Sequence, residues 1–169
     1  MIEFINFIEK VKNNFQTGRL KVRENIELPG GISCDLAGEK TYFSFKGLVV
    51  LSRYFLIQKK DNVTVEDLKH LFDSGFTWAK RVNRVPLFRG LQFAYLVIPV
   101  IVSETTPSQE TLNYIESGAR KHFSLFEFPV IIDLQAGKAH YLRKTQLWGA
   151  FYYSDMRKAV SKFIESTLG

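Results

Sequence analysis

The chain has 169 residues, and its 46% hydrophobic and 14% aromatic side chains supply enough apolar surface for one compact domain over residues 1–169. Its 23 Lys and Arg against 17 Asp and Glu give a net charge of +6, which favours acidic partners but is too mixed for a histone-like tail. A single cysteine, Cys34, excludes an internal disulfide, and the longest apolar runs, 48–57 and 91–102, are shorter than the roughly 20 residues of a membrane span. We therefore expect a cytoplasmic protein without a membrane segment.

In the N-terminal segment, apolar side chains recur three or four residues apart, at Ile2, Ile5, Ile8, Val11 and Phe15. This spacing predicts an amphipathic helix that ends near Gly18. The period then changes to two, which predicts a strand up to the turn "PGG", and "ISCDL" and "KTYFSF" follow as two short strands joined through "AGE". Residues 19–46 are thus predicted to form an antiparallel meander, whose solvent face would carry Arg19, Lys21 and Arg23.

The run "LVVLSRYFLI", residues 48–57, fits either a helix or a buried strand. We interpret it as a helix, because "KG" before it and "QKKDN" after it are typical of helix ends. Thr64 and Asp67 have the spacing of a capping box and predict another helix to about residue 82, which Gly75 could interrupt.

Residues 91–102, "LQFAYLVIPVIV", are apolar and rich in β-branched side chains, which predicts a central strand covered on both faces. Pro99 has no N–H for a central strand, so we expect a bulge or a sheet edge at that point. Thr106 as N-cap, Pro107 at the first helical position and Gln109 then predict the start of the next helix.

Residues 126–145, "FEFPVIIDLQAGKAHYLRKT", predict two strands joined by a turn that begins at Asp133. The segment "DLQAGK" is similar to "DLAGEK" at Asp35, and a glycine with positive φ explains both as turns. A last helix, "DMRKAVSKFIESTL", is predicted to begin after Ser154 as its N-cap.

These elements predict an α+β (mixed α/β) fold with a single mixed sheet of about five or six strands flanked by helices. In this fold an N-terminal helix and an antiparallel meander precede a strand-helix-strand-strand-helix unit.

A helix followed by three strands, a helix and a strand resembles the core order of the PD-(D/E)xK nucleases. That resemblance implies two acids and a lysine that hold Mg²⁺ and activate water. The candidates are Asp35 as the first acid, Lys46 in "SFK" where acid-x-Lys is required, and Asp133 from another strand. An acid is missing from "SFK", so the site lacks one hard oxygen ligand, and turn chemistry is the favoured explanation of Asp133.

Other chemistry has little support in the sequence. His70, His122, His140 and Cys34 occur singly, without the paired spacing of a zinc site or a neighbouring base for the thiol. No glycine-rich phosphate loop and no Gly-x-Ser-x-Gly motif is present. We expect no metal and no cofactor, except Mg²⁺ if the nuclease-like alternative holds.

The segment "WAKRVNRVPLFRG" concentrates four cations, Lys80, Arg81, Arg84 and Arg89. Cations near a helix C-terminus are favoured by the helix dipole, which is a structural explanation. The functional explanation is an anion-binding surface whose arginines bind phosphate or carboxylate groups. Folding could extend this surface with Arg120, Lys121, Arg143 and Lys144.

The favoured function is a non-enzymatic binding module whose basic surface meets an acidic partner, either a protein or a nucleic acid. The alternatives are the nuclease-like hydrolase and a homo-oligomeric or partner subunit. For the last of these, the aromatic segment Leu147–Tyr153 is either an interface or part of the core.

Overall fold

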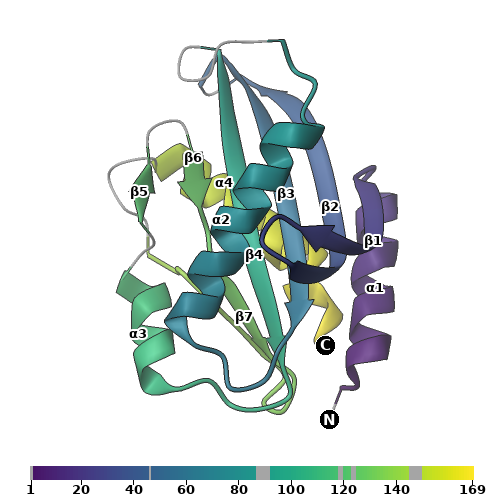
Figure 1. Ribbon diagram of the computed structural model, residues 1–169, viewed down its shortest axis with the longest axis vertical. Helices are drawn as coiled ribbons and strands as arrows, with labels where there is room; N and C mark the ends of the chain where they lie inside the picture. The colour runs from purple at the N-terminus through teal and green to yellow at the C-terminus, as the bar shows by residue number, and fades with distance from the viewer. Residues whose placement is uncertain (1, 46, 87–91, 118–119, 123–124, 145–149) are drawn as a thin grey trace.

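The computed structural model describes residues 2–45, 47–86, 92–117, 120–122, 125–144 and 150–169 (Figure 1). In chain order its elements are α1 Phe4–Thr17, β1 Lys21–Leu28, β2 Ile32–Ser44, β3 Val49–Lys59, α2 Val65–Val82, β4 Phe93–Ser103, α3 Gln109–Ser117, β5 Lys121–His122, β6 Leu125–Glu127, β7 Val130–Asp133, β8 Lys138–Tyr141, α4 Ala150–Phe163 and the 3₁₀ helix η1 Glu165–Thr167. No helix in the described part of the chain combines the length and apolar composition that a membrane span requires.

One mixed sheet contains all the described strands. Six of them follow the order β1-β2-β3-β4-β6-β5, and β7 pairs with β4 and with β8 outside this path. Strands β1, β2 and β3 are antiparallel neighbours, and β4 runs parallel to β3 after the α2 crossover. The β6-β5 and β7-β8 pairs adjoin successive lengths of β4, so the sheet is about six strands wide. The expected α+β fold with a mixed sheet is confirmed.

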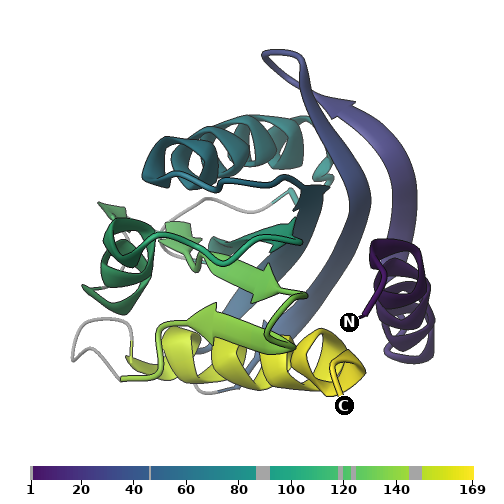
Figure 2. The same cartoon turned by 90° about the horizontal axis from the view of Figure 1, so that it is seen from below.

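Helices cover both faces of the sheet (Figure 2). Helices α1 and α4 enclose one apolar core with the sheet, and α2 and α3 enclose the other. Strand β4 is buried along its whole length, as its continuous apolar sequence predicted.

The region from residue 32 to residue 59 differs from the sequence-based prediction. "ISCDL" and "KTYFSF" are parts of one long strand, β2, and the run 48–57 is largely strand β3 rather than a helix. Strand β3 is paired on both sides, so its side chains alternate between two apolar cores and leave no polar face. "DLAGEK" is therefore not a turn. Its Gly38 lies against Phe15 of α1, whose ring would be 2.7 Å from an added Cβ.

Helix α2 begins with the predicted capping box. The Asp67 N–H donates to Thr64 Oγ1 at 3.2 Å, and the Thr64 N–H donates to Asp67 Oδ2 at 3.0 Å. Gly75 does not interrupt this helix. A Cβ at Gly75 would lie 1.8 Å from Leu56 Cδ1, so the glycine allows α2 to approach β3 closely.

Helix α1 ends at Gly18, as predicted, but its buried face is shifted. Phe7, Val11 and Phe15 are buried, whereas Ile5 is 71% exposed. The apolar spacing therefore predicted a buried face that is slightly rotated about the helix axis from the face that packs against the sheet.

The starts of the last two α-helices also differ from the prediction. Ser108, not Thr106, accepts a hydrogen bond from the first turn of α3, from the Thr111 N–H at 3.3 Å. Helix α4 begins by Ala150, so Ser154 lies inside the helix rather than at its N-cap.

Pro99 lies in neither a bulge nor an edge strand. The partner of β4 changes from β6, opposite residues 95–97, to β7, opposite residues 100–103. The missing proline N–H thus falls near the point where the neighbouring strand is replaced.

Candidate functional site

The two candidate acids lie apart and serve local structure. Asp133 is 1% exposed and accepts a hydrogen bond from the Ala136 N–H at 2.8 Å, at the start of the predicted β7-β8 turn. Asp35 accepts from the Lys59 N–H at 2.7 Å. Asp35 is on β2 and Asp133 on β7, and strands β3 and β4 lie between them. Three strand spacings put the two strands about 14 Å apart. Lys46 lies outside the described residues.

The resemblance to the nucleases requires an acid-x-Lys pair on the third strand. That strand is β3, whereas "SFK" begins at the end of β2. The sequence of β3, VVLSRYFLIQK, contains no acid, so it offers no acid-x-Lys pair. Among the described residues, no group of three His, Cys, Asp or Glu side chains is placed to hold a metal ion.

Cys34 is buried, as predicted for a small apolar side chain. Burial raises the pKa of its thiol to about 12, so the reactive thiolate is disfavoured. The thiol donates weakly to the Leu36 carbonyl oxygen at 3.5 Å.

A basic cavity of about 600 Å³ lies between the first three strands and the C-terminal end of α2. We call it the basic groove. Its charged lining consists of four cations and one acid, namely Lys21, Arg23, Arg81, Arg84 and Glu39.

The β-strand wall of the groove has unused hydrogen-bonding capacity. Glu39 Oε1 lies 3.2 Å from Lys21 Nζ and 3.8 Å from Arg23 Nη2. Glu39 Oε2 and Arg23 Nε are buried, and neither has a hydrogen-bond partner within the described part of the protein. Buried polar groups normally have partners, so this wall could accept a polar ligand.

The helical wall of the groove, formed by the last turn of α2 and the non-helical residues 83–85 that follow it, contains two of the four predicted anion-binding residues. Arg81 and Arg84 are exposed, and neither has an ion-pair partner among the residues that the structure describes. Lys80 points elsewhere, with its Nζ 4.7 Å from the centroid of the Phe76 ring. Arg89 lies outside the described residues.

Aromatic side chains support the groove from beneath. The Tyr54 ring makes an edge contact with Trp78 at 6.0 Å and stacks on Tyr95 at 6.2 Å. The Arg23 guanidinium lies 5.7 Å from the centroid of the Trp78 ring. Burial raises the pKa of Tyr54, so its phenol adds no negative charge to the groove.

Of the suggested extensions, Arg120, Arg143 and Lys144 do not line the groove. Arg120 bridges Asp73 at 2.9 Å and Glu127 at 3.1 Å, so its charge is already compensated. Arg143 pairs with Glu165 at 2.7 Å. The side chain of Lys121 is outside the description.

The described part of the aromatic segment Leu147–Tyr153 lies toward the core. Tyr153 is buried, and the half-buried Tyr152 ring packs on Phe126 with centroids 4.2 Å apart. Residues 147–149 and the side chain of Phe151 are outside the described set.

Sequence reasoning found the helical wall of the groove and part of the strand wall. The alternation of β1 placed Lys21 and Arg23 on one face, but Glu39 was assigned to a turn and Tyr54 to a helix. Glu39 and Tyr54 are direct partners in the β2-β3 register. Comparison of the chain with family models, curated proteins and solved structures found no match, so its function must be inferred from its own geometry.

Proposed function

We propose that the protein is a binding module that holds a single-stranded nucleic acid in the basic groove. The observation that carries this proposal is the position of Arg81 and Arg84. Both are exposed at one end of α2, lack ion-pair partners among the described residues and line the same cavity. Guanidinium groups in this state can bind phosphate oxygens in a bidentate manner.

The cations on the opposite wall favour a ligand with several anionic groups over a ligand with a single one. Lys21 and Arg23 belong to β1, so cations line the groove from two separate elements. Glu39 lies between them and reduces the positive charge of the strand wall. The strongest phosphate contacts are therefore expected at Arg81 and Arg84.

An exposed aromatic side chain next to the groove favours nucleic acid over an acidic protein. Phe43 is 49% exposed, and it lies two residues beyond the groove residue Thr41 on the same face of β2, about 7 Å along the strand. Bases of a single strand stack on such rings whatever their sequence, whereas an acidic polypeptide has no need of them.

The double variant Arg81→Ala/Arg84→Ala tests the phosphate contacts. Its affinity for fluorescent oligothymidylate should fall, and the slope of log affinity against log salt should decrease by about 1.4, because about 0.7 of a counterion is released per phosphate contact in a single strand. The control Lys80→Ala/Lys138→Ala removes the same charge from two exposed lysines outside the groove and should retain the original slope. Wild-type affinity and slope in the arginine variant would contradict the proposal.

Phe43→Ala separates stacking from charge. It should weaken oligothymidylate binding by about 1–3 kcal/mol and leave the binding of heparin, a polyanion without bases, unchanged. If polyglutamate binds as tightly as oligothymidylate and neither responds to Phe43→Ala, an acidic protein is the partner and the nucleic-acid proposal is wrong.

A further inference from the structure

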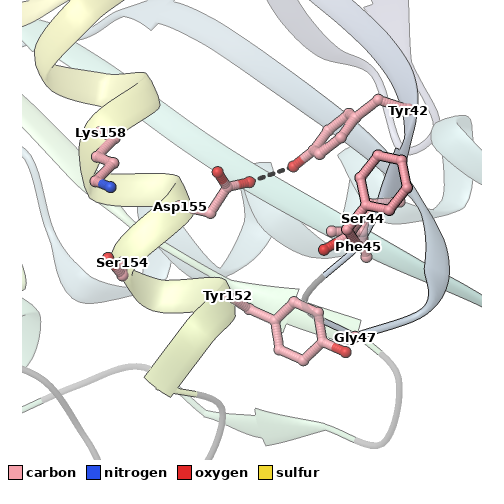
Figure 3. A pocket seen from close by; sticks show the side chains of 9 residues that line it. Tyr42, Ser44, Phe45, Gly47, Tyr152, Ser154, Asp155 and Lys158 are labelled. Atoms are coloured by element: carbon pink, nitrogen blue, oxygen red, sulfur yellow. Dashed lines mark hydrogen bonds between the residues drawn. The ribbon is translucent and has the colours of Figure 1, made fainter.

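A second cavity lies on the opposite face of the sheet, between the β2-β3 hairpin and α4 (Figure 3). It consists of two adjoining hollows of about 280 Å³ and 380 Å³, which share Tyr42, Asp155 and Lys158. None of its lining residues belongs to the basic groove.

The inner end of this cavity contains a buried cation. Arg53 projects from β3, and its Nη2 donates to Tyr42 Oη at 2.6 Å and to Asp155 Oδ2 at 2.5 Å. Tyr42 in turn donates its hydroxyl proton to Asp155. Arg53 Nε is buried without a hydrogen-bond partner in the described structure, and the counter-ion, Asp155, is 41% exposed. The arginine is thus incompletely satisfied by the protein itself.

Two polar side chains of α4 face the same cavity one helical turn apart. Ser154 and Lys158 both line the hollow of about 280 Å³ that Figure 3 shows, and neither has a hydrogen-bond or ion-pair partner among the described residues. A hydroxyl and an ammonium group at i and i+4 can donate to the oxygens of one phosphate. Lys40 and Lys162 line the adjoining hollow, so cations outnumber the single carboxylate.

Two aromatic rings form the outer part of the cavity. Tyr152 packs closely against Gly47, where an added Cβ would lie 3.0 Å from the tyrosine hydroxyl. Phe45, on the hairpin, is 84% exposed and also lines the opening. Leu51 supplies an apolar floor. A planar apolar group would gain contact with these rings.

We propose that this cavity binds a small aromatic phosphate of the mononucleotide class. Its phosphate would bind Ser154 and Lys158, and its planar base would lie against Tyr152 and Phe45. The two hollows are of the size at which small-molecule sites begin, and they combine apolar walls with a few convergent polar groups. This site shares no lining residue with the basic groove, although the Phe45 ring makes an edge contact with Phe43 at 5.1 Å.

Calorimetric titration of the full chain with AMP, adenosine and inorganic phosphate tests the proposal. AMP should bind more tightly than either fragment, because it alone combines the base and the phosphate. Lys158→Ala should weaken AMP binding about tenfold, the effect of losing one charge-assisted hydrogen bond. Gly47→Leu should abolish it by filling the space beside Tyr152. Lys138→Ala, an exposed lysine on β8, is the matched control and should bind AMP as the wild type does.

The outcomes distinguish this site from the basic groove. Arg81→Ala/Arg84→Ala should retain AMP affinity even if it loses oligothymidylate. If that variant loses AMP while Lys158→Ala and Gly47→Leu retain it, AMP occupies the basic groove and the second site is refuted. AMP affinity no greater than that of inorganic phosphate would also overturn the proposal. Circular dichroism of each variant confirms that it is folded.

Discussion

Arg53 in the centre of the sheet donates to Asp155 on α4 at 2.5 Å, across a separation of 102 residues in the chain. On the same face of β3, the neighbouring positions are occupied by Leu51 and Phe55, which pack in the apolar core. A charge at this position is costly unless it is paired, so the interaction fixes α4 against one particular point of the sheet.

Removing the carboxylate should reveal this cost. Asp155→Ala leaves Arg53 buried without its counter-ion and should lower the free energy of unfolding by about 1–3 kcal/mol. Arg53→Met/Asp155→Ala replaces the buried charge by an apolar side chain and should be more stable than Asp155→Ala alone. Urea denaturation measures both variants. If the double variant is instead the less stable of the two, Arg53 contributes through packing rather than through its charge.

Local sequence signals were sufficient where the contacts are local. Thr64 and Asp67 bond each other within one helical turn, so the start of α2 could be predicted. Strand β3 could not, because Phe55 and Leu56 enter different apolar cores and the sequence shows no alternation with polar residues. Gly38 was assigned to a turn because its contact with Phe15 joins two elements far apart in sequence.

The residues of the two cavities also differ in how far sequence could predict them. Arg81 and Arg84 lie only three residues apart in the sequence, so they could be predicted to be neighbours, but α2 ends at Val82 and the extended Asn83, not helical spacing, leads the chain to Arg84. Glu39 faces them only because β2 is one continuous strand in register with β3. The pairing of Arg53 with Asp155 requires the complete sheet and the docked last helix, which no local pattern specifies.

The close contact of Gly75 with Leu56 predicts an effect opposite to helix propensity. In an exposed helix, Gly→Ala stabilises by about 1 kcal/mol. Here the new methyl group would overlap Leu56 Cδ1, so Gly75→Ala should destabilise the protein, since overpacking costs about 1–3 kcal/mol. Thermal unfolding measures the sign.

Shortening the opposing side chain should reduce the damage. Gly75→Ala should cost less in the Leu56→Val background than in the wild type, giving a favourable coupling energy between the two positions. Equal costs in both backgrounds would show that Leu56 is not the obstacle.

The acid within the basic groove is expected to weaken anion binding. Glu39→Gln keeps the size of the side chain but removes the charge that pairs with Lys21 and Arg23. Oligothymidylate affinity should rise about two- to fivefold, the effect expected of a partly exposed ion pair. Fluorescence anisotropy at several salt concentrations measures the change. A fall in affinity would mean that Glu39 itself contacts the ligand.

Half-buried His140 should make stability depend on pH. Burial, followed by the nearby charge of Lys138, lowers the pKa of this imidazole below its usual value of 6.5, although Asp133 and Glu116 act in the opposite direction. Between the lowered pKa and 6.5, the unfolded chain binds a proton that the folded protein does not. The free energy of unfolding should therefore fall as the pH decreases through this range and stop falling, as far as His140 is concerned, below the folded pKa.

The variant His140→Gln removes this titration. Urea denaturation at about pH 7.5 and about pH 5.5 should show a smaller loss of stability in His140→Gln than in the wild type, because glutamine binds no proton in either state. His70→Gln, at an exposed position on α2, controls for the loss of an imidazole elsewhere. If His140→Gln loses as much stability on acidification as the wild type, groups other than His140 cause the acid sensitivity. The Asp67 and Glu165 carboxyls are not among them. Hydrogen bonds from Lys60 and Arg143 lower the pKa of these carboxyls despite opposing desolvation, and their contribution to stability is lost only at more acidic pH.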